Sequence, residues 1–300
     1  RLRDEYGKKC DYDKVAESWE LSCHKDGPSV VADGEYKGLT LNEYIEKAGK
    51  GVLGKNCERF ENFPILIKLI DAKDNLSVQV HPDNDYAMRV EGEYGKTEMW
   101  YVVDCDEGAT LLYGFKHEIT KEEFARRIAD NTLLEVTNAV PVKKGDVFFI
   151  KSGTLHAIGK GILIAEIQQN SNTTYRIYDY GRVGKDGKPR ELHVDKALDV
   201  TKLAPAEQYP ETPVEKKDGY DIKLLSKCEY FTTYRVNVET KAELDADENS
   251  FNSILVLEGE PVISGGETVS AKKGESVFIS AGTGKYTVEG KCTFVLTKID

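Results

Sequence analysis

The sequence predicts a mainly β protein built from two β-barrels with a few short helices. Three observations lead to this fold class: many short strand-like segments separated by Gly-, Asp- and Asn-rich turns, little helical patterning, and a weak internal repeat. The strand-like segments include residues 65–70, 77–80, 99–103, 109–113, 146–150, 163–168 and 174–178. Many short strands with few helices are typical of a sandwich or a barrel.

Two segments have the pattern of a helix. Residues 41–48 are one candidate. In the other, residues 120–130, Thr120 and Glu123 have the spacing of a capping box and precede an apolar stripe that includes Phe124. We therefore expect short helices, the second within a helical insertion at about residues 117–135.

The repeat relates two segments of seventeen residues. Residues 145–161 (GDVFFIKSGTLHAIGKG) align without gaps with residues 274–290 (GESVFISAGTGKYTVEG), and six positions are identical. Each copy follows a strand–turn–strand segment. The repeat predicts an N-terminal catalytic domain of residues 1–203 and a C-terminal barrel of residues 214–300, joined by a coil-rich connection near residues 203–213.

Composition limits the partners of the chain. Its formal net charge is -11 and its basic residues are scattered, whereas a nucleic-acid site needs a basic stripe. The acidic composition is compatible with a small anionic substrate, because a pocket for one needs only a few local cations.

The longest apolar runs are too short to span a bilayer, and no secretion signal opens the chain, which starts at Arg1. Six cysteines without a CxxC pair indicate reduced thiols, so we expect a cytoplasmic protein, a monomer or alternatively a homodimer.

Two of the five histidines lie in settings typical of metal ligands. In the segment LSVQVHPD, strand alternation places Ser77, Gln79 and His81 on one face and apolar residues on the other. Such a polar face inside a barrel needs a partner, because a buried polar group without one costs about 1–3 kcal/mol. Glu98 and His156 complete a set of two nitrogens and two oxygens that Zn²⁺ accepts, and we expect one zinc ion per chain.

The other histidines receive no such assignment. His24, His117 and His193 are interpreted as ordinary core or surface residues. The position aligned with His156 in the second copy is Lys285, and no histidine follows His193. We therefore expect the second barrel to be metal-free and structural.

The motifs QVHPD, GKTEMWYVVD, SGTLHAIGKGILIAEIQQ and NTTYRIYDYGR, in this order, resemble those of type I mannose-6-phosphate isomerases of the short bacterial form, within the cupin superfamily. The resemblance runs from about residue 2 to residue 300. It implies two cupin-type jelly-roll barrels and interconversion of mannose 6-phosphate and fructose 6-phosphate.

The resemblance also implies roles for single residues. Ser77 and Lys96 correspond to positions that line the substrate site, Arg176 to the catalytic arginine, and Glu166 to an acidic residue of the same cleft. The zinc ligands it implies are Gln79, His81, Glu98 and His156. We count Lys96 among the catalytic candidates as well, because an ammonium with a depressed pKa can exchange protons. Trp19 is a candidate wall of the sugar site, although a structural tryptophan is the alternative.

Two departures from the family pattern matter. The Trp-Gly-Gly segment that normally opens such chains is absent, so we expect part of the substrate cleft to be missing. Asn172 stands where an Asp is expected, and an amide can act neither as a carboxylate base nor as an ion-pair partner.

Two other functions stay open from the sequence. A cupin oxygenase that uses iron or manganese would share these ligand types and would consume oxygen. A sugar-phosphate-binding cupin without catalysis, which Asn172 favours, would bind hexose phosphate without exchanging protons at C1 or C2.

Overall fold

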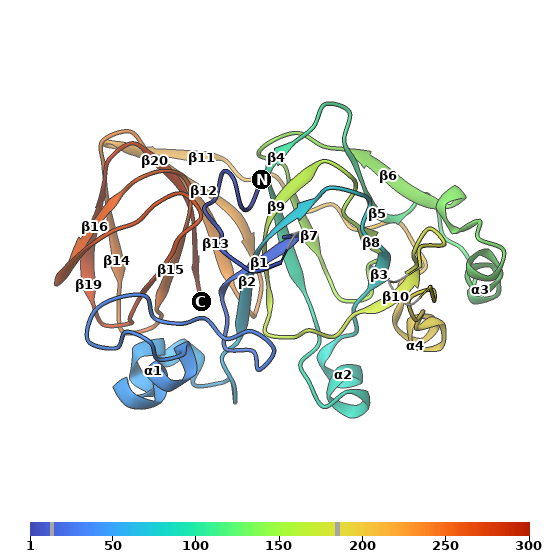
Figure 1. Cartoon of the computed structure of the whole chain (residues 1–300), viewed down its shortest axis with the longest axis horizontal. Helices are drawn as coiled ribbons and strands as arrows, with labels where there is room; N and C mark the ends of the chain where they lie inside the picture. Colours follow the sequence, from blue (N-terminus) through green and yellow to red (C-terminus); the bar gives the residue numbers. More distant parts are fainter. Residues whose placement is uncertain (13–14, 184–186) are drawn as a thin grey trace. The chain divides into compact units, whose positions relative to one another are not determined.

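A computed structural model describes residues 1–12, 15–183 and 187–300. Two compact units make up the chain: residues 70–209, here the middle unit, and residues 1–69 together with 210–300, here the N/C unit. Both are rich in strands and carry few helices, which confirms the predicted fold class (Figure 1). Within the described residues, none of the helices combines the length and the apolar character needed to cross a membrane.

The middle unit contains two antiparallel sheets. In one, β9, β4 and β7 are neighbours in that order; in the other, the order is β10-β3-β8-β5-β6. The strands are β3 (Val78–Val80), β4 (Glu98–Cys105), β5 (Thr110–Phe115), β6 (Thr137–Pro141), β7 (Val147–Ile150), β8 (His156–Ala157), β9 (Ile162–Gln169) and β10 (Tyr175–Tyr178). Between the sheets lies an apolar core to which β4, β5 and β9 contribute Trp100, Leu111 and Ile164.

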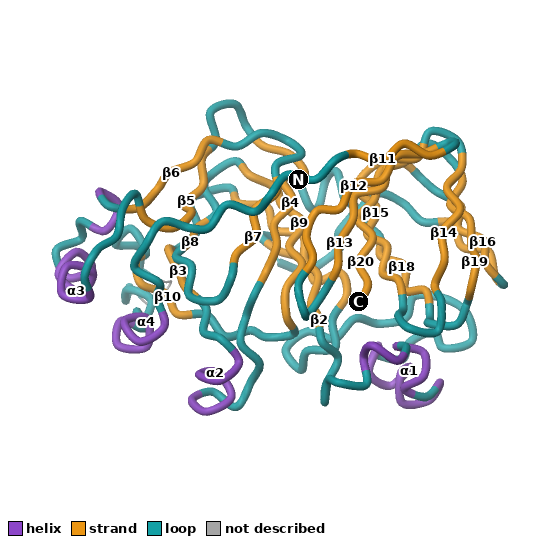
Figure 2. The backbone as a smooth tube through the Cα atoms, turned by 180° about the vertical axis from the view of Figure 1, so that it is seen from behind, coloured by secondary structure: helices purple, strands orange, loops and turns teal. Residues whose placement is uncertain are grey.

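Helices cover the outer face of the second sheet. α3 (Lys121–Ala129) and α4 (Val194–Val200) lie beside β10, β3, β8 and β5 in both views (Figures 1 and 2). A second core joins Val78 and Val80 of β3 to Phe124 of α3 and Ala197 of α4. Since Val78 and Val80 point outward, Gln79 points inward between the sheets, as the alternation predicts.

The N/C unit repeats this arrangement. Its strands are β1 (Glu17–Leu21), β2 (Ile65–Ala72, which runs across the sequence boundary between the units), β11 (Val214–Lys217), β12 (Tyr220–Lys227), β13 (Thr232–Val238), β14 (Lys241–Ala246), β15 (Asn252–Gly259), β16 (Val262–Gly265), β17 (Glu267–Ser270), β18 (Ser276–Ile279), β19 (Gly284–Glu289) and β20 (Cys292–Lys298). The orders β20-β15-β18 and β14-β19-β16-β17 match β9-β4-β7 and β3-β8-β5-β6 of the middle unit. The shared topology supports the predicted internal repeat.

The first 69 residues pack with the C-terminal strands. This segment contains α1 (Leu41–Ala48) and the short 3₁₀ turns η1 (Lys50–Leu53) and η2 (Lys55–Cys57). The backbone N–H groups of Phe251 and Ala281 donate to the carbonyls of Leu53 and Val52, at 3.1 and 2.8 Å. Gly54 has φ +87°, and a Cβ there would lie 2.5 Å from the backbone of Asn249, so the approach requires glycine.

These compact units are not the same as the predicted domains. The sequence groups residues 1–69 with the catalytic segment up to residue 203, whereas the structure groups them with residues 210–300. The reason is that the backbone hydrogen bonds of η1 and η2 are with loops that flank strands far along the chain, at residues 248–251 and 281, and adjacency in sequence carries no signal of such pairing. The division into domains 1–203 and 214–300 stays a prediction.

The predicted helices agree with the structure. α1 occupies residues 41–48, and Thr40 and Glu43 form a reciprocal capping box at its start. α3 begins after Thr120, whose hydroxyl accepts from the N–H of Glu123 at 3.1 Å, and the turn η3 (Leu133–Glu135) follows it. The sequence reading missed α2 (Asn84–Val90) and α4, which are seven residues each.

Candidate metal centre and active site

The predicted metal ligands come from three strands of the middle unit. Gln79 lies on β3 and His81 directly follows that strand, while Glu98 and His156 are the first residues of β4 and β8. Gln79 and His156 are directly paired across β3 and β8. Strand pairing therefore brings together residues that are up to 77 positions apart in the sequence.

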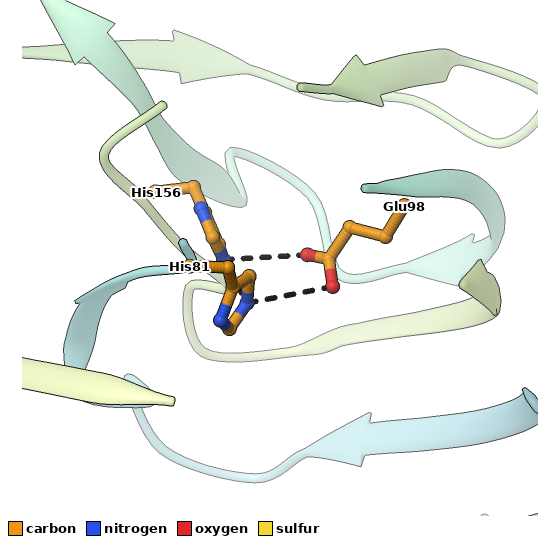
Figure 3. Close-up of side chains that lie close together, drawn as sticks. All are labelled: His81, Glu98 and His156. Carbon is orange, nitrogen blue, oxygen red and sulfur yellow. Dashed lines mark hydrogen bonds and ion pairs between the residues drawn. The ribbon is translucent and has the colours of Figure 1, made fainter. Parts of the chain in front are cut away.

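His81, Glu98 and His156 point toward one another (Figure 3). The Nε2 atoms of the two histidines are 3.1 Å apart. One Glu98 oxygen lies 3.3 Å from Nε2 of His156, and the other lies 3.5 Å from Nε2 of His81. All three side chains are at most 1% exposed. Among the described residues, this is the group of His, Cys, Asp and Glu side chains close enough to hold a metal ion.

Backbone carbonyls fix how the two imidazoles are protonated. Nδ1 of His156 lies 2.8 Å from the carbonyl oxygen of Thr154, and Nδ1 of His81 lies 3.1 Å from that of Thr173. A carbonyl only accepts, so each Nδ1 carries the proton and donates it. In the neutral rings Nε2 then presents a lone pair toward the centre, and such a partner on the other nitrogen is typical of metal-binding histidines.

Burial keeps His156 neutral. It lowers the pKa of this imidazole to about 4, and the positive charge of Lys96 acts in the same direction. At neutral pH the ring is therefore a lone-pair donor, the form in which histidine binds metals.

The three residues are close enough to share one ion. Bonds of 2.0–2.2 Å in a tetrahedron place nitrogen and oxygen ligands about 3.3–3.6 Å from one another. The two Nε2 atoms are 3.1 Å apart, and each has a different oxygen of Glu98 at 3.3 or 3.5 Å, so one ligand atom from each residue lies within 4.8 Å of the other two. Two lone pairs and a carboxylate directed at one point also need a cation to offset their repulsion. The residues present therefore fit a divalent metal ion.

Gln79 lies next to this group. Its side-chain Nε2 is 3.3 Å from Nε2 of His156, so the amide lies at the edge of the centre. An amide also carries an oxygen on the same carbon, and half a turn about its last bond exchanges the two atoms. Gln79 can therefore present a neutral oxygen to the centre.

The predicted cationic residues lie on the elements around the centre. Lys96 is 4% exposed, and its ammonium donates to the hydroxyl of Thr174 at 3.3 Å. Arg176, on β10, is paired with Gln79 across the sheet, and its Nε donates to the hydroxyl of Ser77 at 3.2 Å. Three of the predicted substrate-site residues, Ser77, Lys96 and Arg176, thus share one side of the middle unit's second sheet.

Two further arginines lie near Arg176. Arg182 and Arg190 both form ion pairs with Asp179, a carboxylate that is 6% exposed. Burial lowers the pKa of Arg176, and the charges of Arg190 and Arg182 act in the same direction. Asp179 and Glu191 act in the opposite direction, but the three guanidinium groups outnumber these two carboxylates, so the region around Arg176 carries a net positive charge although the chain as a whole is acidic.

Glu166 is held by a residue that the sequence analysis overlooked. Its Oε2 accepts a 2.8 Å hydrogen bond from Nε1 of Trp100, and the carboxylate is buried. Trp100 also packs its ring edge-on against His156, with centroids 5.3 Å apart. Trp100 lies two residues after Glu98 on one strand, so the alternation rule could have placed it on the same face.

Trp19 lies in the N/C unit, outside the group described above. Its Nε1 donates to Glu17 at 3.2 Å, and its ring packs against His24 and Lys68. These contacts give Trp19 a structural role within its own unit, and its part in substrate binding stays a prediction. Asn172, the departure from the family pattern, is exposed.

Comparison with known proteins identifies the family. Residues 4–108 match the phosphomannose isomerase type I catalytic domain, and residues 221–299 match the mannose-6-phosphate isomerase cupin domain. The mannose-6-phosphate isomerase ManA of Bacillus subtilis is 39% identical over 288 residues, 95% of this chain and 90% of that protein. The mannose-6-phosphate isomerase of Streptococcus mutans is 39% identical over 286 residues, 93% of this chain and 87% of that protein.

A solved structure agrees with these matches. The crystal structure of the mannose 6-phosphate isomerase from Bacillus subtilis superposes with a TM-score of 0.92 at 37% identity, covering 99% of this chain and 93% of that one. Similarity of this extent in sequence and in fold confirms the resemblance seen in the motifs. The chain belongs to the type I phosphomannose isomerase family, with the cupin fold.

Proposed function

We propose that this protein is a zinc-dependent isomerase that interconverts D-mannose 6-phosphate and D-fructose 6-phosphate through an enediol. The observation that carries the proposal is the buried group of His81, Glu98 and His156 beside Lys96, in a chain whose curated relatives are mannose-6-phosphate isomerases. The zinc ion would be held by Gln79, His81, Glu98 and His156. When bound, zinc supplies a Lewis acid that polarises the sugar carbonyl.

The reaction needs groups that move protons. A base removes the proton from C2 of the aldose and returns one to C1, while a proton passes from O2 to O1, so no atom is gained or lost. A positioned acid–base group contributes about 10²–10⁴-fold to the rate. Glu166 and Lys96 are the candidates: both are buried, and charges on both act on His156.

The phosphate needs cations. Arg176 offers a guanidinium that matches a phosphate or an enediolate, and its Nε is oriented by Ser77. Arg182 and Arg190 strengthen the positive potential near Arg176. This local charge supports an anionic sugar as the substrate.

The test is a coupled assay for fructose 6-phosphate formed from mannose 6-phosphate. Zinc-loaded wild type should turn over, whereas chelator-treated protein and His156→Ala should not. Folded, zinc-loaded wild type that binds mannose 6-phosphate without turnover would instead identify a non-catalytic sugar-phosphate-binding cupin. In that event Asn172→Asp is the first variant to make, because it restores the carboxylate of the family pattern.

The cysteines indicate the cellular compartment of the enzyme. All six cysteines are free thiols, which supports a reducing compartment, and we propose the cytoplasm. The predictions of a monomer or homodimer and of a hexose phosphate as the small-molecule partner belong to the same proposal.

A further inference from the structure

An acidic segment connects two of the metal-ligand candidates. Residues 82–96 leave the site after His81, form α2, and return to it just before Glu98. Hydrogen bonds close the base of this excursion: the N–H of Lys96 donates to the carbonyl of Pro82 at 2.9 Å, and the N–H of Gly95 donates to the side chain of Asn84 at 2.9 Å. Its far end carries Glu91 and Glu93, which from the sequence alone resemble a solvated acidic edge.

The structure corrects that interpretation of Glu91. Its Oε1 accepts from the hydroxyl of Tyr175 at 2.8 Å and from the ammonium of Lys196 at 2.6 Å. These two contacts join α2 to β10 and to α4. They also hold the pKa of Glu91 below its ordinary value, the Lys196 hydrogen bond first, so the group is an anion at neutral pH.

Tyr175 links Glu91 to the residues that face the metal centre. It is 2% exposed and is paired with Val80 on the outer face of β3, so the residues directly before and after it face the site. Those neighbours are Thr174, which accepts from Lys96, and Arg176. The carbonyl that orients His81 belongs to Thr173, two residues before Tyr175. A displacement of Tyr175 would therefore move groups that contact a metal ligand and two cationic residues.

We propose that Glu91 is a positioning residue: by holding Tyr175 and Lys196 it fixes β10 and thereby sets the orientation of His81, Lys96 and Arg176. The side chain of Glu91 hydrogen-bonds to Tyr175 and Lys196 rather than to a ligand candidate. Its part in turnover rests on the proposed function, whereas its part in metal binding does not.

The test compares zinc affinity by chelator competition in the full chain for Glu91→Ala, Tyr175→Phe, the double variant and Glu91→Gln. Glu135→Ala is the matched control, because the Arg127–Glu135 pair has the same 2.6 Å separation but no hydrogen bond to β10. Groups that contact a metal ligand directly are typically worth about 10–100-fold in affinity, so a contact one step further out should be worth about 3–10-fold. The KM for mannose 6-phosphate should rise in the same variants.

Specific outcomes decide the proposal. Both single variants should weaken zinc binding while the double variant loses no more than the worse single one, because they break one contact. Glu91→Gln keeps an acceptor oxygen and should bind zinc more tightly than Glu91→Ala. Zinc affinities equal to that of the control, whatever the unfolding temperatures, would overturn the proposal. If these variants bind zinc more weakly but the wild type has no isomerase activity, the positioning role of Glu91 stands and only the proposed function is refuted.

Discussion

At the scale of single residues, the chemistry of the site depends on a buried charge. Glu98 is fully buried beside His81 and beside His156, whose buried imidazole is neutral at neutral pH. A buried carboxylate is expensive in a metal-free chain and favourable once a cation neutralises it. Stability and metal affinity should therefore respond in opposite directions to the loss of this charge.

The variant Glu98→Gln tests this directly. It keeps the shape of the side chain, so we expect zinc affinity to fall by at least about 100-fold, the upper end for groups that merely support a ligand. Without zinc, its unfolding temperature should equal or exceed that of wild type. Chelator competition and thermal unfolding measure the two effects. The control is Glu135→Gln, which changes an exposed ion pair and should bind zinc as wild type does. A zinc affinity of Glu98→Gln equal to that of wild type would contradict the prediction.

Residue patterns predicted part of this site and could not predict the rest. The alternation along residues 77–81 placed the polar side chains on one face because strands have a period of two. The carbonyls of Thr154 and Thr173, which orient the histidines, carry no signature because every residue has a carbonyl. Glu91 looked like any surface acid, since its partners Tyr175 and Lys196 come from distant segments.

At the scale of elements, local signals separate α1 and α3, which the sequence predicts, from α4, which it does not. α1 and α3 begin with Thr at the N-cap and Glu three residues later. α4 has no side-chain capping bond, and its start is set by tertiary contact: the N–H of His193 donates to the carbonyl of Arg176 at 2.8 Å. Such a helix depends on β10 more than on its own sequence.

The cap of α3 gives a prediction at this scale. Thr120→Ala removes the acceptor for the N–H of Glu123 and should lower the free energy of unfolding by about 1 kcal/mol, which is typical of N-caps. Urea unfolding measures the change, and Thr120→Ser, which keeps the hydroxyl, should retain most of the stability. Equal losses in the two variants would show that the methyl group matters rather than the cap.

At the scale of the whole molecule, the N/C unit is assembled from both ends of the sequence. Phe63 and Tyr44 pack against Phe251 and Phe278, and backbone hydrogen bonds join residues 52–56 to loops beside the C-terminal strands. A fragment cut at the predicted boundary, whether residues 1–203 or residues 214–300, lacks these contacts. Sequence adjacency could not reveal this, because the repeat marks where the second barrel lies but not what packs on it.

A fragment of residues 210–300 should therefore not fold cooperatively alone. Removing residues 1–69 exposes Phe251, which is fully buried in the intact chain, and leaves backbone groups of the C-terminal segment without their partners. Far-UV circular dichroism during urea unfolding measures this, and co-expression with residues 1–69 should restore a cooperative transition. A sharp transition in the isolated fragment would support the boundary predicted from the sequence.

The two matching topologies also predict how many zinc ions the molecule binds. Asn252 faces Ile279 in the N/C unit as Glu98 faces Ile150 in the middle unit, and Lys285, aligned with His156, is exposed. The amide of Asn252 donates to the hydroxyl of Tyr286 at 2.9 Å, so this position holds a neutral hydrogen-bonded pair.

We expect one zinc per chain by elemental analysis and none in the variant with both His81 and His156 changed to Ala. Free zinc at 100 times the dissociation constant should stabilise wild type by about 2.7 kcal/mol and this variant not at all. A second equivalent that survives in the variant would place a metal elsewhere in the molecule and contradict the assignment of the second barrel as structural.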